Sequence, residues 1–282
     1  MILDALIDSL IDSAKLIPFL LLTYVLLEYL EHKATKKTEE FIGKSGRFGP
    51  LFGSLLGVIP QCGFSAAASG LYAGRVITMG TLISIYLSTS DEMLPILISE
   101  QVGVSEIFKI LGLKVLIGII GGFAVDLIFR QKDKETAPHT QIEHMCDHEH
   151  CHCKEGKIFK SAIIHTLQVI AFIFIVSLVL NILIAFVGED AITAFVSDRK
   201  ILSVFLAALI GLVPNCAASV VITQLYLDGI LGFGAMMAGL LVGAGVGLLV
   251  LFKANDALKD NLKIVGILYV IGVISGFSLL KF

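Results

Sequence analysis

The sequence predicts an all-α integral membrane protein made of two inverted-topology repeats, each with three transmembrane helices and one re-entrant helical hairpin. Composition is the first observation: of 282 residues, 56% are hydrophobic and 16% are charged, whereas a soluble domain carries about a quarter charged residues. The second is a set of long apolar blocks, such as 16–30, 163–187 and 231–252, which approach or exceed the roughly 20 residues that cross a bilayer. The third is an internal repeat.

A shift of 154 residues aligns the two halves of the chain without a gap. It places Pro60-Gln61-Cys62 on Pro214-Asn215-Cys216 and Leu71-Tyr72 on Leu225-Tyr226. Further pairs match in the same register: Gly57 and Gly211, Ser65 and Ser219, Gly80 and Gly234, Lys109 and Lys263, Gly122 and Gly276. Membrane segments share few residue types and can resemble each other by chance. The coincidence of Pro, Cys, Tyr and Lys in one register favours a true duplication.

Each half is expected to contain the same four elements in the same order. The first half has a span near 15–31, an interrupted segment near 49–74, and spans near 76–98 and 107–130. The second half has a span near 160–187, an interrupted segment near 201–227, and spans near 230–252 and 262–281. These assignments divide the chain into a first repeat, 1–130, a polar connector, 131–159, and a second repeat, 160–282.

The basic residues predict how the two halves are related. If the interrupted segments enter and leave on one face as hairpins, each half crosses the bilayer three times and the halves are inverted. All the basic loops, at 33–47, 75, 130–160 and 253–263, then lie on the cytoplasmic face. If the interrupted segments cross the bilayer, the first basic loop and the basic connector lie on opposite faces. The positive-inside rule favours the hairpins, with both termini extracytoplasmic.

The two interrupted segments carry the first candidate substrate-binding residues. Pro60 lacks an amide donor and ends one half-helix, while Gly63 permits a turn and Ser65 can cap the next helix. A single Pro of this kind is often a structural kink, but here a second Pro with polar neighbours stands in register. Paired interruptions in inverted repeats place the substrate at the repeat interface. The candidates are Gln61, Cys62, Ser65, Asn215, Cys216 and Ser219.

A polar stretch inside the expected span 76–98 supplies the second group of candidates: Ser88, Thr89, Ser90, Asp91 and Glu92. Ionised carboxylates in hydrocarbon are costly, so they mark either the interfacial end of a span or a functional site. The apolar run 93–98 that follows favours a functional site. Carboxylates and amides suit Mn²⁺ and thiols suit softer metals, so the candidate metal ligands are Asp91, Glu92, Asn215, Cys62 and Cys216. Lys114, inside the span 107–130, either pairs with an acid or faces a cavity.

The connector is rich in histidine and cysteine. It contains His139, His144, Cys146, His148, His150, Cys151, His152 and Cys153. This composition is typical of metal binding, although the spacing fits no single closed zinc motif. The composition favours a metal-capturing or sensing loop over a merely solvated linker, and leaves delivery and sensing both open.

These motifs resemble a known family. The Pro-Gln-Cys-Gly and Pro-Asn-Cys tips, the Thr89-Ser90-Asp91-Glu92 stretch and the His/Cys-rich loop are similar to the ten-segment heavy-metal exporters. These bacterial proteins are related to the arsenical permeases and are often labelled manganese transporters. Three spans plus a two-armed hairpin per half agree with ten segments. The resemblance covers nearly the whole chain and implies heavy-metal export across the bacterial inner membrane.

The expected function is therefore that of a multi-pass secondary transporter that exports a divalent transition-metal ion such as Mn²⁺, with proton coupling as an option. A metalloid, arsenical or small-anion permease is the alternative. The sequence contains no Walker, His-Glu-x-x-His or Gly-x-Ser-x-Gly motif, which argues against an enzyme. No resident cofactor is required, since the metal ion is the substrate and an expected ligand of the loop. The expected partners are the metal ion and the lipid bilayer, with no nucleic acid, and a homodimer is a possible assembly.

Overall fold

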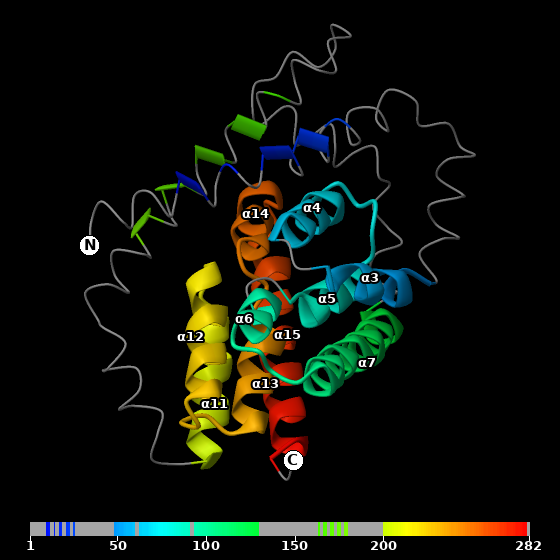
Figure 1. The fold of residues 1–282 in the computed structure, drawn as a ribbon. Helices are drawn as coiled ribbons and strands as arrows, with labels where there is room; N and C mark the ends of the chain where they lie inside the picture. Colours follow the sequence, from blue (N-terminus) through cyan, green and yellow to red (C-terminus); the bar gives the residue numbers. More distant parts are fainter. Residues whose placement is uncertain are drawn as a thin grey trace, which may run out of the picture.

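The computed structural model describes residues 48–59, 62–90, 93–129 and 200–280, with isolated helical residues within 10–25 and 163–179 (Figure 1). The described residues form helices and connecting turns and include no strand. The helices are α3 (Gly49–Gly57), α4 (Cys62–Ala73), α5 (Met79–Ser88), α6 (Met93–Ser99), α7 (Val104–Phe129), α11 (Lys200–Gly211), α12 (Cys216–Leu227), α13 (Phe233–Val242), α14 (Gly247–Ala254) and α15 (Leu258–Ser278). The expected spans 15–31 and 160–187 lie almost wholly outside the described residues, and the connector 131–159 lies entirely outside them.

Helix boundaries repeat at the shift found in the sequence. Both ends of α4 and α12 are related by 154 residues, and so are both ends of α5 and α13. The first residues of α6 and α14, Met93 and Gly247, are related in the same way, as are those of α7 and α15. The matched residues therefore occupy matched positions in matched helices.

The matched glycines are contact points between helices. A Cβ atom added to Gly122 would lie 2.7 Å from the carbonyl oxygen of Gly80, and one added to Gly276 would lie 2.8 Å from that of Gly234. These two contacts join α7 to α5 and α15 to α13, and they are equivalent under the shift. Small residues at such positions let two helix backbones approach closely, which is how membrane helices gain packing energy. The glycine pairs thus have the same packing role in both halves.

Two expected continuous spans are broken in the middle. The segment 76–98 is divided into α5 and α6, and the segment 230–252 is divided into α13 and α14. In the second half, Gly245 adopts a φ of 52°, a left-handed conformation that costs glycine little. In the first half, the Thr89 hydroxyl donates to the carbonyl oxygen of Ile85 at 2.7 Å and the Ser88 hydroxyl to that of Ser84 at 2.9 Å. Such bonds at the end of α5 compete with continuation of the helix.

Three described segments have the length and composition of membrane spans: Val104–Phe129, Phe233–Ala254 counted through its break, and Leu258–Ser278. Their burial differs sharply. In Phe233–Ala254, 89% of the most apolar window is buried inside the protein, against 33% in each of the other two. Large apolar side chains on α7 and α15, such as Leu127 and Ile274, are exposed. Helices α13 and α14 therefore lie in the core together with α5, whose residues are almost all buried. Helices α7 and α15 present apolar surface outward, as a lipid-facing helix does.

Each half packs one helix against the other half. Helix α4 of the first half packs on α14 of the second, and α12 of the second half packs on α6 of the first as well as on α11 and α13 of its own half (Figure 1). Where these helices end, Arg75 forms an ion pair with Asp260 at 3.5 Å, and the Tyr226 hydroxyl donates to Glu106 at 2.7 Å. Glu106 and Asp260 are equivalent under the shift. The contacts between the halves are thus reciprocal, as in a two-fold interface.

Helices α7 and α15, which are equivalent under the shift, run in opposite directions. Lys263, near the start of α15, lies 3.6 Å from the ring centroid of Phe129 at the end of α7. Lys109, near the start of α7, lies 5.0 Å from the ring centroid of Phe233 at the start of α13. The last turn of α15 packs on the first turn of α13. Helix α7 therefore begins at the end of the structure where α15 finishes, and finishes where α15 begins.

Candidate functional site

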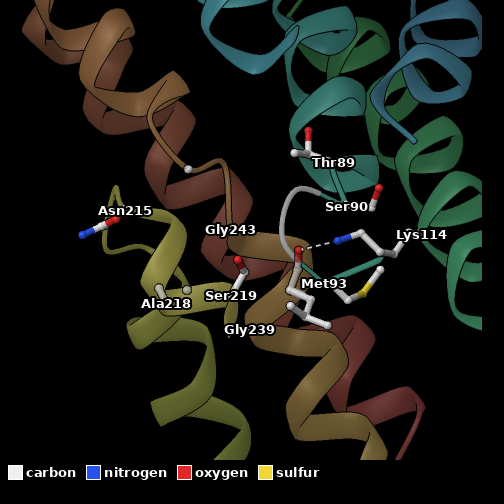
Figure 2. Close-up of a pocket in the computed structure, with 12 residues that line it drawn as sticks. Thr89, Ser90, Met93, Lys114, Asn215, Ala218, Ser219, Gly239 and Gly243 are labelled. Atoms are coloured by element: carbon white, nitrogen blue, oxygen red, sulfur yellow. Dashed lines mark hydrogen bonds between the residues drawn. The ribbon is translucent and has the colours of Figure 1, made fainter. Parts of the chain in front are cut away.

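A pocket lies where several helix ends meet in the interior of the protein (Figure 2). The end of α5, the end of α11, the start of α12 and the break between α13 and α14 all contribute to it. Its lining residues are Thr89, Ser90, Met93, Lys114, Gly211, Asn215, Ala218, Ser219, Gly239, Leu240, Gly243 and Gly245. Residues from both halves of the chain therefore face the same space.

Lys114 is the charged residue among the pocket-lining residues. It extends from the middle of α7, is only 1% exposed, and donates from Nζ to the carbonyl oxygen of Leu240 at 2.7 Å (Figure 2). Leu240 lies in the last turn of α13, where helix carbonyls lack intrahelical donors and carry a partial negative charge. The ammonium thus binds the carbonyl end of a broken helix and links the two halves.

Thr89 and Ser90 line the pocket at the break after α5. Thr89 donates its proton to the carbonyl oxygen of Ile85 at 2.7 Å, and Ser90 donates to that of Val58 at 2.6 Å. A hydroxyl has one proton and two lone pairs. Because each proton is used by the backbone, both oxygens can offer only lone pairs to a ligand. This arrangement suits a bound cation better than an anion.

The start of α12 forms the wall of the pocket opposite Lys114 in the view of Figure 2. Asn215 immediately precedes the helix, is 5% exposed, and accepts the amide proton of Ala218 on its backbone carbonyl oxygen at 3.2 Å. The expected capping by Ser65 and Ser219 is wrong, because α4 and α12 begin three residues earlier and include both serines.

The structure brings four of the predicted site residues together: Thr89, Ser90, Asn215 and Ser219 line the pocket. Ser65 and Ser88 are buried but do not line it. Ser65 packs against Gly247 at the start of α14, where an added Cβ atom would lie 2.9 Å from the Cβ atom of Ser65. The Ser88 hydroxyl donates to the carbonyl oxygen of Ser84 in its own helix. Cys62 and Cys216 are the first residues of α4 and α12, and their side chains lie outside the described part of the structure.

The remaining predicted residues lie outside the described part of the chain. They are Gln61, Asp91, Glu92, His139, His144, Cys146, His148, His150, Cys151, His152 and Cys153. Within the described ranges, no three His, Cys, Asp or Glu side chains cluster closely enough to hold a metal ion.

Glycines of the second half also line the pocket: Gly239, Gly243 and Gly245. Gly243 is the counterpart of Thr89 and Gly245 that of Asp91 under the shift, so the repeat identifies these two from the sequence as the backbone side of the site. Gly239 and the carbonyl of Leu240 were not predicted. No sequence signal marks the carbonyl of Leu240, since every residue has one.

The corresponding region of the first half is filled by side chains. Tyr86, the counterpart of Leu240, is fully buried, and its hydroxyl lies 2.6 Å from the hydroxyl of Ser69. Ser69 in turn lies 2.7 Å from the carbonyl oxygen of Gly247 at the start of α14. This cluster joins α4, α5 and α14. The position that Leu240 takes beside the pocket is therefore occupied in the first half by a buried tyrosine whose hydroxyl lies in a hydrogen-bonded cluster.

Comparison with known families gives one match over the chain. The family described as "putative, 10TM heavy-metal exporter" matches residues 1–189 and 165–282. Comparisons with curated proteins and with solved structures gave no match.

Proposed function

The chain belongs to this family of ten-segment heavy-metal exporters, and on that basis we propose that it exports a divalent transition-metal ion, Mn²⁺ or a similar ion. The observation that carries the proposal is the pocket at the meeting point of two broken helices and the start of α12. In transporters with broken helices, the substrate site lies at such a point, and half-helix carbonyls coordinate the transported cation. The pocket is then the metal site.

The proposed architecture is a pair of inverted repeats with re-entrant hairpins. The opposite directions of α7 and α15 support it, and so do the reciprocal contacts between the halves. The pairs α3–α4 and α11–α12 are the proposed hairpins, interrupted beside Pro60 and Pro214. Two hairpin arms and three spans per half account for the ten segments.

The proposed ligands combine residues that face the pocket with residues next to them in the chain. Ser90 and Thr89 offer lone pairs, and Asn215 offers an amide oxygen. Asp91 and Glu92 directly follow Ser90 and supply the negative charge that a divalent ion requires. Cys62 and Cys216, at the starts of α4 and α12, add thiolate ligands for a softer metal. The carboxylates also carry the counter-transported protons in this scheme.

The His/Cys-rich connector is proposed to capture the metal ion on the cytoplasmic side before transport. Its imidazole and thiol groups are typical transition-metal ligands, and cytoplasmic thiols stay reduced. Replacing all its His and Cys residues should slow transport at low cytoplasmic metal concentration and leave the maximal rate at saturating metal unchanged. Unchanged transport at every metal concentration would show that the loop has no role in delivery.

One observation favours a second function, transport of a metalloid, an arsenical or a small anion. Lys114 places a buried positive charge in the pocket, and the start of α12 adds a helix N-terminus, which also attracts anions. Under this alternative, Lys114 binds the substrate directly.

Transport into proteoliposomes separates the two functions. The transport rates of Mn²⁺, Zn²⁺, Cd²⁺ and Co²⁺ are measured side by side with that of arsenite. The wild-type protein should transport Mn²⁺ and should not transport arsenite. The double variant Asp91→Asn/Glu92→Gln should lose metal binding, with Glu106→Gln as a control outside the pocket. Unaltered metal affinity in the double variant would exclude this site, and movement of arsenite without metal ions would establish the alternative.

A further inference from the structure

The ammonium group of Lys114 occupies the kind of position that a transported cation takes. Carbonyl groups at the end of a broken helix coordinate cations in transporters of this architecture. Here the carbonyl of Leu240, in the last turn of α13, accepts a 2.7 Å hydrogen bond from Nζ of Lys114. A side-chain cation therefore stands where the helix end attracts positive charge.

The contact joins the two halves at the pocket. Lys114 belongs to α7 and Leu240 to α13, and the surrounding lining comes from both halves. The shift relates Lys114 to Leu268 and Leu240 to Tyr86, so the sequence supplies no second lysine at the counterpart position. Tyr86, the counterpart of Leu240, is fully buried. The lysine–carbonyl contact at the pocket therefore has no equivalent under the shift.

We propose that Lys114 is a built-in competitor of the metal ion, which holds the carbonyl end of α13 while the pocket is empty and is displaced when a metal ion enters. The inference rests on the proposed metal transport. Two cations in one small buried pocket repel each other strongly, because the surrounding dielectric is low. The four-carbon stem of lysine is flexible and can carry the ammonium away from the carbonyl.

This competition has a mechanistic consequence. A metal ion that must displace Lys114 binds less tightly than the ligands alone would allow. When the ammonium group of Lys114 moves back to the Leu240 carbonyl, its positive charge repels the metal ion and promotes release. The bridge from α7 to α13 forms only in the empty pocket, so the contact between the halves depends on occupancy. Metal binding and the relative arrangement of the halves are thereby linked.

Binding measurements on the full-length protein test the proposal. Mn²⁺ affinity is measured by titration calorimetry at one pH for the wild type, Lys114→Met, Lys114→Gln and Lys114→Arg. Lys109→Met is the matched control, since it removes the same charge from the same helix outside the pocket. Thermal unfolding of each variant establishes that it is folded.

The neutral variants should bind Mn²⁺ at least about tenfold more tightly, which corresponds to about 1.4 kcal/mol, while their transport rate falls because the ion is not expelled. Lys114→Arg and Lys109→Met should bind like the wild type. A lysine that only caps α13 would leave the affinity unchanged or reduce it when removed, and that result in a folded variant overturns the proposal. If the wild type binds no metal ion but binds an arsenic oxyanion that Lys114→Gln loses, the proposed metal transport itself is wrong.

Discussion

Substituting alanine for Gly122 and Gly276 tests whether the two halves share one packing plan. A Cβ atom on Gly122 would lie 2.7 Å from the Gly80 carbonyl oxygen and 2.8 Å from the Cβ atoms of Pro50 and Ser84. A Cβ atom on Gly276 would lie between 2.7 and 2.9 Å from atoms of the three counterpart residues. Carbon atoms in ordinary contact are about 3.5–4.0 Å apart, so both methyl groups force their neighbours apart on three sides.

The expected cost follows from two opposing terms. Overpacking of a tightly packed site costs about 1–3 kcal/mol, while replacing glycine by alanine in a helix gains about 0.5–1 kcal/mol. Both variants should therefore be destabilised, by up to roughly 2.5 kcal/mol. Gly112 and Gly266 are ideal controls, because they lie in the same two helices, are related by the same shift, and have no neighbour within 4 Å of an added Cβ atom.

Thermal unfolding of the four full-length variants in detergent provides the assay. The contact variants and the control variants should differ by several degrees in midpoint, at about 2–4 °C per kcal/mol for a chain of this size class. The controls should match or exceed the wild type. Equal destabilisation of Gly112→Ala and Gly122→Ala, or opposite effects at Gly122 and Gly276, would refute the reasoning.

Two further predictions concern contacts near helix ends, and a third concerns the topology of the chain. Tyr226→Phe removes the 2.7 Å hydrogen bond to Glu106 and should lower stability by about 1 kcal/mol in the same unfolding assay; an unchanged midpoint would show that the contact between the halves contributes nothing. Asp126→Ala removes the acceptor of the Gly80 amide and the Thr78 hydroxyl at the start of α5, both at 2.8 Å, and should cost about 1–2 kcal/mol, whereas a neutral result would contradict its capping role. Single cysteines at positions 37 and 157, in a chain without its native cysteines, should both react with a thiol reagent added from the cytoplasmic side, and labelling from opposite sides would exclude the inverted repeats.

The repeat and the helical class were accessible from the sequence because they depend on residue type and order alone. Glycine, proline and tyrosine recur at a fixed shift, and the helix boundaries of α4, α5, α12 and α13 follow it. The interruptions beside Pro60 and Pro214 were predicted for the same reason, since proline acts on its own backbone.

The breaks after α5 and α13 were not predicted. In the first half the polar stretch 88–92 was interpreted as a candidate site inside a continuous span, and in the second half apolar composition continues through the break. The break after α5 involves hydroxyls that return their protons to the same helix, and the break after α13 involves a left-handed Gly245. Both depend on neighbouring helices that enclose the irregular backbone. Lys114 was recognised as unusual, but its partner is a carbonyl 126 positions away, which no residue type marks.

The packing of α4 on α14 also constrains how the chain folds during synthesis. Helix α4 ends at Ala73, but the helix that covers it, α14, begins only at Gly247. Ser69 and Tyr86 therefore reach the membrane long before the Gly247 carbonyl that completes their hydrogen-bonded cluster. In a nascent first half, the hydroxyl groups of Ser69 and Tyr86 therefore lack the carbonyl acceptor that the second half provides. Truncation after the connector should leave a product that membrane proteases remove, and co-expression of the second half as a separate chain should rescue it.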